Sequence, residues 1–419
     1  MTEAHLPDAL ARAVADPKSY ADLDALHEKL TLIRRDHPFA RSDLPDYHPF
    51  WVASKFDDIQ SVARRNDVFR SGLGSLATRK MAAMATSEGQ GFRSVVGMNE
   101  PEHVKYRLLT QAWFAPKNIK RLEDGMRRLA RHYVDRMTQA GGEIDFVKEV
   151  AVHYPLLVVM SILGVPAEDE PMMLRLTQEY FGNGDEELTR RGTLTPEEIQ
   201  AGLMETIAEV SAYFRRVTDD RRRNPTDDLA SVIANGRVDG ELMPEIDSLG
   251  YYITVAFAGH DTTSSSTAGG LWALAQRPEE LAKVKADLSL IPGLVEESIR
   301  WTTPIHQFVR VAAEDADVRG QTVRQGDHVV LCFPSGNRDE DVYEDPFAFR
   351  VDRQTNRHVA FGYGAHQCLG MHLARMEMAI FFEELLPRLK SVELAGEPRR
   401  TITNFVGGPK TLPLRYELI

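Results

Sequence analysis

The sequence predicts a mainly α-helical protein with a smaller β lobe, an α+β fold in which one domain spans residues 1–419. Up to about residue 300, apolar residues recur mostly with the period of amphipathic helices. Beyond that point, short segments alternate apolar and polar residues between Gly and Pro turns, as strands do. No internal repeat, low-complexity tract or Pro/Ser-rich linker divides the chain.

The expected elements follow one another closely. Helical patterns cover residues 20–35, 101–114, 116–138, 145–163, 169–181, 196–223, 244–275 and 371–386, and strand patterns cover 50–53, 308–318, 322–333 and 391–419. The helix at 244–275 carries few charges after Asp247, so we expect it to be central and buried. Two stretches, 70–98 and 182–195, have no regular pattern, and loops this long are usually functional or mobile.

Composition excludes several classes of protein. The net charge of −12 argues against nucleic acid as a partner. Residues 1–20 contain no apolar signal-peptide core, and no stretch approaches the roughly 20 apolar residues of a membrane span. There are only two cysteines, Cys332 and Cys368, so neither a disulfide framework nor a thiolate-rich metal site is expected. We expect Cys332, in an apolar run, to lie in the core of a cytoplasmic protein without a membrane partner.

The second cysteine lies in a glycine-rich loop that precedes a helix. The motif Phe361-Gly-Tyr-Gly-Ala-His-Gln-Cys-Leu-Gly370 has glycines at 362, 364 and 370, which permit unusual backbone angles and close approaches. The start of the following helix offers a positive dipole end and unpaired amide donors, which lower the pKa of a thiol. The sequence therefore predicts a thiolate at Cys368, suited to be an axial ligand of haem iron.

This motif, Phe-Gly-x-Gly-x-His-x-Cys-x-Gly, resembles the haem-binding loop of the cytochrome P-450 superfamily. The resemblance implies that Cys368 is the metal ligand of a haem b, that Phe361 packs near the sulfur, and that His366 lies near a haem propionate. Gly362 and Gly370 belong to the same cofactor-binding loop. The fold implied is the cytochrome P-450 fold, with a long central helix over the haem.

The long expected helix contains Ala258-Gly-His-Asp-Thr-Thr263 near its middle. A glycine, an acid and an alcohol are unfavourable inside a buried helix, so something must offset them. The segment resembles the oxygen-activating groove of the superfamily. The resemblance implies that Ala258 and Gly259 line the haem, that Gly259 leaves room for dioxygen, and that Thr262 hydrogen-bonds the bound oxygen while Asp261 relays protons. A π-type distortion often accompanies such sites, and His260 is expected to have a packing role.

Further motifs resemble structural and cofactor-binding parts of the superfamily. Glu297 and Arg300 share one helix face, and the segment 345–353 matches the region that supplies a third member, Arg353. We assign these three to fold integrity. Haem propionates need cationic partners, and the positions that match are His103, Arg107, Arg310 and His358.

Apolar residues in segments that match substrate-facing parts of the superfamily predict a hydrophobic pocket with few polar anchors. They are Met81, Met84, Val95, Val96, Thr254, Phe257, Ala258, Ile305, Phe308, Phe405 and Val406. Arg79, Lys80 and Arg93 flank the loop, but no cation is obviously placed for a fatty-acid carboxylate. The helix at 116–138 is rich in Lys117, Lys120, Arg121, Arg127, Arg128 and Arg131, which form either a solvated face or a surface that steers an acidic ferredoxin.

Within the superfamily, the chain is most similar to the bacterial, α-terpineol-hydroxylating group, on residues 296–301, 382–387 and 404–410. The resemblance implies a monooxygenase that hydroxylates a monoterpenoid or aromatic hydrocarbon with O2. Its two electrons would come from an iron–sulfur ferredoxin served by an NAD(P)H-dependent ferredoxin reductase. One alternative is a peroxide-driven fatty-acid peroxygenase, although such enzymes typically replace the acid–alcohol pair that Asp261 and Thr262 provide. The other is a non-catalytic protein that binds haem or a hydrophobe.

Overall fold

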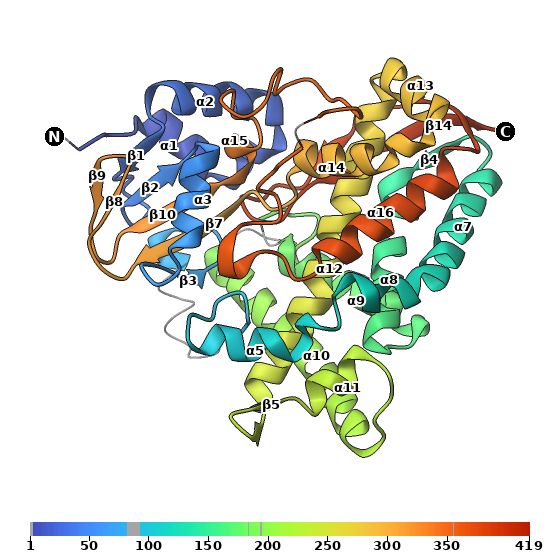
Figure 1. Ribbon diagram of the computed structural model, residues 1–419, viewed down its shortest axis with the longest axis horizontal. Coiled ribbons are helices and arrows are strands. Elements are labelled where there is room, and N and C mark those ends of the chain that lie inside the picture. Colours follow the sequence, from blue (N-terminus) through green and yellow to red (C-terminus); the bar gives the residue numbers. More distant parts are fainter. Residues whose placement is uncertain (1–2, 82–92, 183, 193–194, 355) are drawn as a thin grey trace.

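The computed structural model describes residues 3–81, 93–182, 184–192, 195–354 and 356–419. Figure 1 shows a β-rich region on one side of the molecule and a larger helical region on the other. The predicted division into a helical and a smaller β lobe is therefore confirmed. Among the helices of the described residues, none combines the length and apolarity needed to cross a membrane.

The main sheet has five strands in the order β1-β2-β10-β7-β3. β10 pairs with β2 in parallel, whereas the other neighbours are antiparallel. Cys332, the last residue of β10, is fully buried, as predicted. The strands are β1 (Phe39–Ser42), β2 (Phe50–Ala53), β3 (Phe69–Leu73), β7 (Gln307–Ala312) and β10 (His328–Cys332), flanked by α1 (Asp8–Ala15), α2 (Leu23–Asp36), α3 (Phe56–Arg64) and α15 (Phe333–Gly336).

The helical region is built around α12 (Glu245–Ala275), which is buried along most of its length as predicted. α12 packs against α8 (His153–Leu163), α14 (Ile291–Thr302) and α16 (Met371–Leu385). The remaining helices are α5 (Glu102–Gln111), α6 (Pro116–Ile119), α7 (Glu123–Gln139), α9 (Glu170–Phe181), α10 (Pro196–Arg223), α11 (Leu229–Ala234) and α13 (Pro278–Ala286).

Smaller sheets complete the fold. β11 (Leu389–Leu394), β14 (Pro413–Leu418) and β4 (Glu143–Asp145) form a three-stranded sheet. Hairpins join β5 (Arg237–Val238) to β6 (Glu241–Leu242) and β8 (Ala316–Val318) to β9 (Gln321–Val323), and β12 (Arg399–Arg400) pairs with β13 (Pro409–Thr411).

The structure corrects several predicted boundaries. The expected helix at 145–163 begins as strand β4, because Asp145 pairs with Pro413 and accepts a hydrogen bond from the Leu412 amide. A π-helical turn, Val147–Ala151, then leads into α8. The helix expected at 116–138 is divided into α6, a 3₁₀ turn and α7. The strand expected at 308–318 is two strands, β7 and β8.

The expected irregular segment 182–195 is firmly anchored where the structure describes it. Asp185 is nearly inaccessible, and both of its carboxylate oxygens accept hydrogen bonds from Lys410 Nζ of β13, at 2.9 and 2.8 Å. Glu187 pairs with Arg399 of β12 at 2.6 Å. The segment after α9 is thus held on the C-terminal hairpin.

Candidate active site

The cysteine loop is closed by backbone hydrogen bonds and by two glycines with positive φ. Gly362 (φ 66°) donates its N–H to Val359 O at 2.8 Å, and the Cys368 amide donates to Phe361 O at 2.8 Å. Gly364 has φ 73°, and a Cβ there would lie 2.5 Å from the carbonyl oxygen of Ala63 in α3. Gly370 has neither constraint, so only the first two glycines are required by this geometry.

The thiol of Cys368 corrects one electrostatic prediction. Desolvation raises its pKa, whereas the Gly370 amide, Arg107 and Arg375 act in the opposite direction and do not overcome it. The residue nevertheless has exposed surface. Protein groups therefore surround this thiol closely enough to desolvate it, although part of the residue remains accessible. The helix N-terminus alone therefore does not produce a thiolate, and a bound metal ion would have to stabilise it.

Two histidines lie together beside this loop. The rings of His103 on α5 and His366 are 4.1 Å apart. His103 Nδ1 lies 3.0 Å from Glu100 Oε1. The Nε2 atoms of both rings are buried and have no hydrogen-bond partner among the described residues. Burial, together with His103, Arg310 and Arg107, lowers the pKa of His366 to about 3, so this imidazole is neutral.

Two arginines complete the cluster. Arg107, one turn after His103 on α5, donates to Gln367 O at 2.7 Å and so ties α5 to the cysteine loop. Arg310 on β7 is buried, and its one hydrogen bond among the described residues goes to Val309 O at 3.3 Å. Desolvation lowers the pKa of Arg310 to about 10. A buried guanidinium without a carboxylate is costly unless an anion joins it.

His358 has a different neighbour from the others. Its Nε2 lies 3.2 Å from Glu296 Oε2 as an ion-pair contact, and both ring nitrogens lack hydrogen-bond partners among the described residues. Glu296 also accepts from Arg375 at 2.5 and 2.9 Å. Although burial opposes it, contact with His358 and Arg375 lowers the pKa of Glu296 to about 2.

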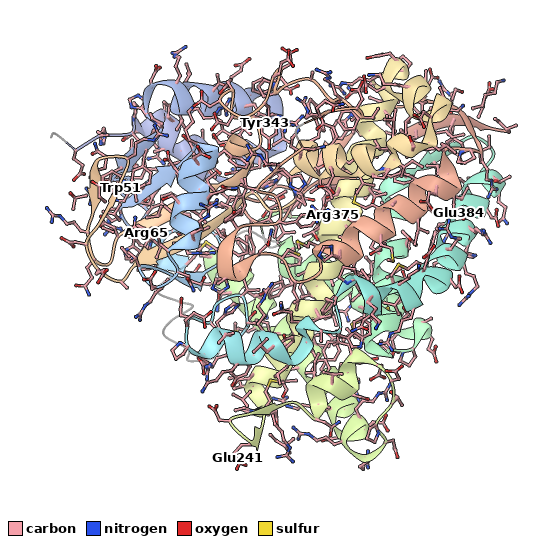
Figure 2. All side chains as sticks on the ribbon, in the orientation of Figure 1. Trp51, Arg65, Glu241, Tyr343, Arg375 and Glu384 are labelled. Atoms are coloured by element: carbon pink, nitrogen blue, oxygen red, sulfur yellow. The ribbon has the colours of Figure 1, made fainter. Side chains whose placement is uncertain are left out.

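Sequence reasoning missed Arg375, whose guanidinium lies 4.6 Å from the ring of Phe361. Figure 2 shows Arg375 near the centre of the molecule, whereas Glu384 of the same helix lies toward the outside. The position of Arg375, in the first two turns of the helix that follows Cys368, could have indicated it. Phe361 also contacts His358, with ring centroids 5.4 Å apart.

The buried helix α12 carries one accessible stripe. Thr254, Asp261 and Thr262 are only partly buried and Ala258 is exposed, at the three- and four-residue spacing of a single helix face. Thr262 Oγ1 donates to Ala258 O at 2.8 Å. Asp261 Oδ2 is buried without a hydrogen-bond partner among the described residues, and burial raises the pKa of this carboxyl while His260 opposes the rise.

The structure changes the account of Gly259. A Cβ at this position would lie 2.9 Å from Val159 Cγ2 of α8, so the space that Gly259 leaves is occupied by the neighbouring helix. The sequence predicts that Gly259 leaves room for dioxygen, but any such room would lie on a different side of α12. The expected π distortion is absent from α12 itself, which is α-helical throughout.

His260 is fully buried, in keeping with the predicted packing role. Its Nε2 contacts Val152 O at 2.7 Å, directly after the π turn, and its Nδ1 lies 3.2 Å from Thr177 Oγ1 of α9. Nδ1 is also 3.4 Å from Asp261 Oδ1. The side chain therefore joins three helices beside the acid.

Glu297, Arg300 and Arg353 form the ion-pair network that the sequence predicts. Glu297 accepts two hydrogen bonds of 2.7 Å from Arg300, and Arg353 Nε lies 3.3 and 3.2 Å from its two oxygens. The side chains of Glu297 and Arg300 are inaccessible. Although burial opposes it, Arg300, the Arg350 amide and Arg353 hold the pKa of Glu297 below its usual value. The remaining guanidinium groups donate to backbone carbonyls of the 337–348 region.

Phe181, which sequence reasoning missed, contacts two of the predicted pocket residues. Phe181, the last residue of α9, has ring contacts of 6.3 Å with Phe257 and 6.2 Å with Phe405. Phe405 in turn contacts Phe308 at 5.5 Å. Phe181 ends the helix predicted at 169–181, and the periodicity of that helix does not indicate which rings Phe181 would contact. Ile305 and Val406 form an isolated β-bridge.

Other predicted pocket residues fall elsewhere. Val95 is buried in the main core, whereas Val96 is 39% exposed. Met81 is partly buried, and Met84 lies outside the described residues. The cations that flank this loop are engaged: Lys80 with Glu197, Arg93 with Glu102 and Asp247, and Arg79 with Tyr47 O.

The basic helix is also partly neutralised. Arg127 pairs with Glu123, Glu383 and Glu384, and Arg131 pairs with Glu384. Arg121 pairs with Asp227. The predicted excess of positive charge on this helix is therefore smaller in the folded protein than along the sequence.

These residues fit a haem. Beside the cysteine loop, two imidazole Nε2 atoms have no hydrogen-bond partner among the described residues, and the Arg310 guanidinium donates only to a backbone carbonyl. Haem propionates are the kind of group that would satisfy them. The Cys368 thiol is the available iron ligand, and its pKa responds to Arg107 and Arg375 of the same cluster.

Comparison with known proteins gives a consistent result. Residues 47–416 match the family model described as cytochrome P450. Cytochrome P450-terp from a Pseudomonas species is 44% identical, over 99% of this chain and 98% of that protein. A steroid C26-monooxygenase from Mycolicibacterium smegmatis is 34% identical over 95% of this chain and 94% of that protein.

Among solved structures, CYP108D1 from Novosphingobium aromaticivorans superimposes with a TM-score of 0.92 at 44% identity, covering 99% of this chain and 100% of that one. Both the matched length and the identity exceed what fold similarity alone would give. The chain therefore belongs to the cytochrome P450 family of haem-thiolate monooxygenases.

Proposed function

We propose that this monooxygenase hydroxylates a small hydrophobic terpenoid or aromatic compound with O2, using haem b bound to Cys368. The two electrons would come from an iron–sulfur ferredoxin and an NAD(P)H-dependent reductase, in the cytoplasm, and residues 1–419 would act as one domain. The observation that supports the cofactor assignment lies beside the cysteine loop: His103 Nε2 and His366 Nε2 have no hydrogen-bond partner among the described residues, and the buried Arg310 guanidinium reaches only a backbone carbonyl.

The haem, when bound, would supply the dioxygen activation that no side chain provides. This chain's own residues would bind it, deliver protons and exclude water. We assign propionate contacts to His103, Arg107, Arg310 and His358, and Phe361 would shield the sulfur together with Arg375. His358 would have to share its buried side with Glu296.

Asp261 and Thr262 are proposed to move the protons. Because burial raises the pKa of Asp261, its carboxyl holds a proton closer to neutral pH than a solvated aspartate does. Its free atom, Oδ2, has no competing partner among the described residues. The Thr262 hydroxyl donates to Ala258 O, so it must rotate from that carbonyl to pass a proton onward.

The substrate class rests on the pocket and on the relatives. The aromatic rings of Phe257, Phe181, Phe405 and Phe308 form a connected apolar wall. Lys80 and Arg93 are paired with carboxylates, which disfavours a free fatty acid. The name of the 44% identical relative, cytochrome P450-terp, also favours a terpenoid.

The surface for a ferredoxin is proposed to include Lys117, Lys120 and Arg128 of α6, the following turn and α7. These cations have no ion-pair partner among the described residues, whereas Arg127 and Arg131 are bound to α16. Charged residues of this kind would steer an acidic partner and make its association depend on ionic strength.

The decisive experiment replaces the proposed iron ligand. Cys368→Ser should lose the red-shifted Soret band of the reduced carbon-monoxide complex, which reports a thiolate ligand, whereas Cys332→Ser should retain it. An unchanged band in Cys368→Ser would refute the ligand assignment.

A second experiment addresses the proton route. Thr262→Ala should continue to consume NADH while diverting reducing equivalents to peroxide, and Asp261→Asn should slow turnover with a larger solvent isotope effect. Thr263→Ala is a matched control, because the Thr263 hydroxyl bonds Gly259 O within the same helix and is buried. Tight coupling in Thr262→Ala, or equal uncoupling in Thr263→Ala, would remove the alcohol from the mechanism.

A further inference from the structure

Beside the acid of α12 lies a buried histidine that the proposed proton route does not use. His260 is fully buried, and its Nε2 lies 2.7 Å from the carbonyl oxygen of Val152, at the end of the π-helical turn. A carbonyl oxygen only accepts hydrogen bonds, so Nε2 carries a hydrogen and donates it there. In a neutral ring, Nδ1 is then an acceptor without a hydrogen. The contact that packs one side of the ring therefore leaves the other nitrogen available.

Two oxygen atoms lie close to Nδ1. Thr177 Oγ1 of α9 is 3.2 Å away, and Asp261 Oδ1 is 3.4 Å away. The Thr177 hydroxyl has one hydrogen, which is directed to Leu174 O at 2.9 Å within α9. If His260 were neutral and Asp261 ionised, Nδ1 and the two oxygens would meet as three acceptors with no hydrogen among them. One additional proton gives this cluster the donor that it lacks.

The charge of Asp261 has little other compensation. Among the described residues its one ion-pair contact is with His260, and neither a Lys nor an Arg pairs with it. Its side chain is 19% exposed, and Oδ2 is buried without a hydrogen-bond partner in the described part of the chain. Burial raises the pKa of this carboxyl, and His260 opposes the rise. A carboxylate in such a position is costly unless it is paired or protonated.

The elements packed around the histidine and the acid present groups that do not titrate. The π turn supplies the Val152 carbonyl, α9 supplies the Thr177 hydroxyl, and α8 places Val159 against the same turn of α12. None of these groups gains or loses a proton near neutral pH. A proton taken up here is therefore shared by His260 and Asp261, and the two titrate as one unit.

We propose that His260 and Asp261 hold one proton in common, between Nδ1 and Oδ1, and that His260 is a positioning residue that keeps the acid protonated for delivery. This inference rests on the proposed function, in which Asp261 supplies protons and Thr262 passes them on. When the carboxyl releases the proton toward Thr262, a neutral imidazole and a carboxylate remain. A proton from solvent then restores the pair through the exposed part of Asp261. No bond between heavy atoms changes and no electron is transferred in this step.

The first test locates the proton without turnover. The histidine rings of the holoenzyme are labelled with ¹⁵N, and the signals of His260 are assigned in the diamagnetic ferrous carbon-monoxide complex by comparison with His260→Gln. At neutral pH we expect either a hydrogen on Nδ1 or the infrared C=O band of a protonated carboxyl that Asp261→Asn lacks. Either signal places the shared proton on the pair. An Nδ1 without hydrogen, together with an ionised Asp261, overturns the inference.

The second test uses α-terpineol as the probe substrate in the ferredoxin-driven reaction. A glutamine at position 260 can still donate to Val152 O but holds no proton at the position of Nδ1. We expect His260→Gln to lower kcat roughly tenfold and to increase the solvent isotope effect, whereas Asp261→Asn, which removes the proton donor, should lower kcat about 10²-fold or more. The alkaline limb of the profile of kcat against pH should move to lower pH in His260→Gln, because a carboxyl alone binds the proton less tightly than the pair does.

Two control variants separate the shared proton from packing. Thr177→Val removes the other oxygen that contacts Nδ1, and it should retain the proton on the pair and the wild-type pH profile. His132→Gln changes an exposed histidine of α7 and should behave as wild type in every measurement. An intact carbon-monoxide Soret band shows that each variant keeps its haem site. A fall in kcat in His260→Gln with an unshifted pH profile and an unchanged isotope effect would indicate a packing role and overturn the inference.

Failure of the proposed function looks different. If wild-type protein does not oxidise α-terpineol, the proposed substrate class is wrong. If Asp261→Asn turns over as fast as wild type, the proposed proton route is wrong. In both cases the nitrogen and infrared spectra still show whether His260 and Asp261 hold a proton in common.

Discussion

Two buried polar regions of this molecule differ in how completely their groups are partnered. Around Glu297, Arg300 and Arg353, the acceptors and donors are matched by one another or by backbone carbonyls. Around His366 and Arg310, the imidazole and guanidinium nitrogens largely lack partners among the described residues. Buried polar groups are nearly always hydrogen-bonded. The first region therefore satisfies its own hydrogen-bonding groups. The second leaves groups that an anionic ligand would satisfy.

The contrast separates residues that maintain the fold from residues that serve the cofactor. A complete network loses stability when one member is removed, because the others remain buried and unpaired. An incomplete cluster should instead lose affinity for the group that completes it. The following predictions test this distinction in order of decreasing effect.

The largest effect is expected at the complete network. Glu297→Gln leaves Arg300 and Arg353 buried without a counter-charge and should reduce the free energy of unfolding by about 3–5 kcal/mol. Urea denaturation of the holoenzyme measures it. Glu143→Gln removes a carboxylate from the exposed pair with Arg415 and should change stability by less than about 0.5 kcal/mol. Equal effects of the two substitutions would contradict the assignment of Glu297 to the fold.

The incomplete cluster should respond through the haem. Arg310→Leu removes a desolvated guanidinium and, with it, the charged hydrogen bond that we propose it donates to a propionate, an expected loss of about 1.5–3 kcal/mol in haem binding. The rate of haem transfer to apomyoglobin should therefore rise roughly 10- to 100-fold. Arg324→Leu, at an exposed ion pair with Asp315, is the control and should leave the rate unchanged. An unaltered rate in Arg310→Leu would place Arg310 outside the cofactor site.

A smaller effect is expected where α12 crosses α8. Gly259→Ala places a methyl group against Val159 and should reduce stability by about 1–3 kcal/mol through overpacking. Val159→Ala should restore most of that loss in the double variant, which a double-mutant cycle measures. The Soret spectrum of the carbon-monoxide complex should stay the same. A changed spectrum without a loss of stability would instead support the role beside dioxygen that the sequence predicts.

The last prediction concerns pH. Glu377 of α16 is buried, its Oε1 has no partner among the described residues, and burial raises its pKa well above the usual value. A raised folded pKa means that the contribution to stability is present below the unfolded pKa of about 4.3 and is lost as pH rises toward the folded value. Glu377→Gln should thus gain up to about 1.4 kcal/mol over wild type per pH unit above pH 5.

Urea denaturation at pH 5, 6, 7 and 8 measures that slope. Glu393→Gln, an exposed position on β11, should follow the wild-type curve at every pH. Parallel curves for wild type and Glu377→Gln would mean that Glu377 ionises in the folded protein as readily as in the unfolded chain.

Local spacing accounts for what sequence reasoning found. The cysteine loop, the acid and alcohol on α12 and the Glu297–Arg300 pair each lie within about one or two turns of chain, so motif and period suffice to find them. Phe181, which was missed, acquires its ring contact only from Phe405, a partner distant in sequence, and a single sequence contains no signal for such a pair. Arg375, also missed, lies close to Phe361 in the sequence, and its place in the helix that follows Cys368 could have indicated it.

Contacts between distant segments also changed the predicted charges and boundaries. The basic helix lost much of its excess charge to Glu383 and Glu384, which lie more than 250 residues further along the chain. Asp145 became part of a strand because β14 was available to pair with it.

The sequence by itself determined the family and the long central helix, and it singled out Cys368, Asp261 and Thr262 as candidate site residues, because short-range patterns encode these. The tertiary structure decided which way Gly259 opens, which donors remain without partners, and whether the thiol of Cys368 has a raised or lowered pKa. Each of these depends on desolvation and contact, which are sums over every group packed around a site and therefore exist only once distant segments have come together.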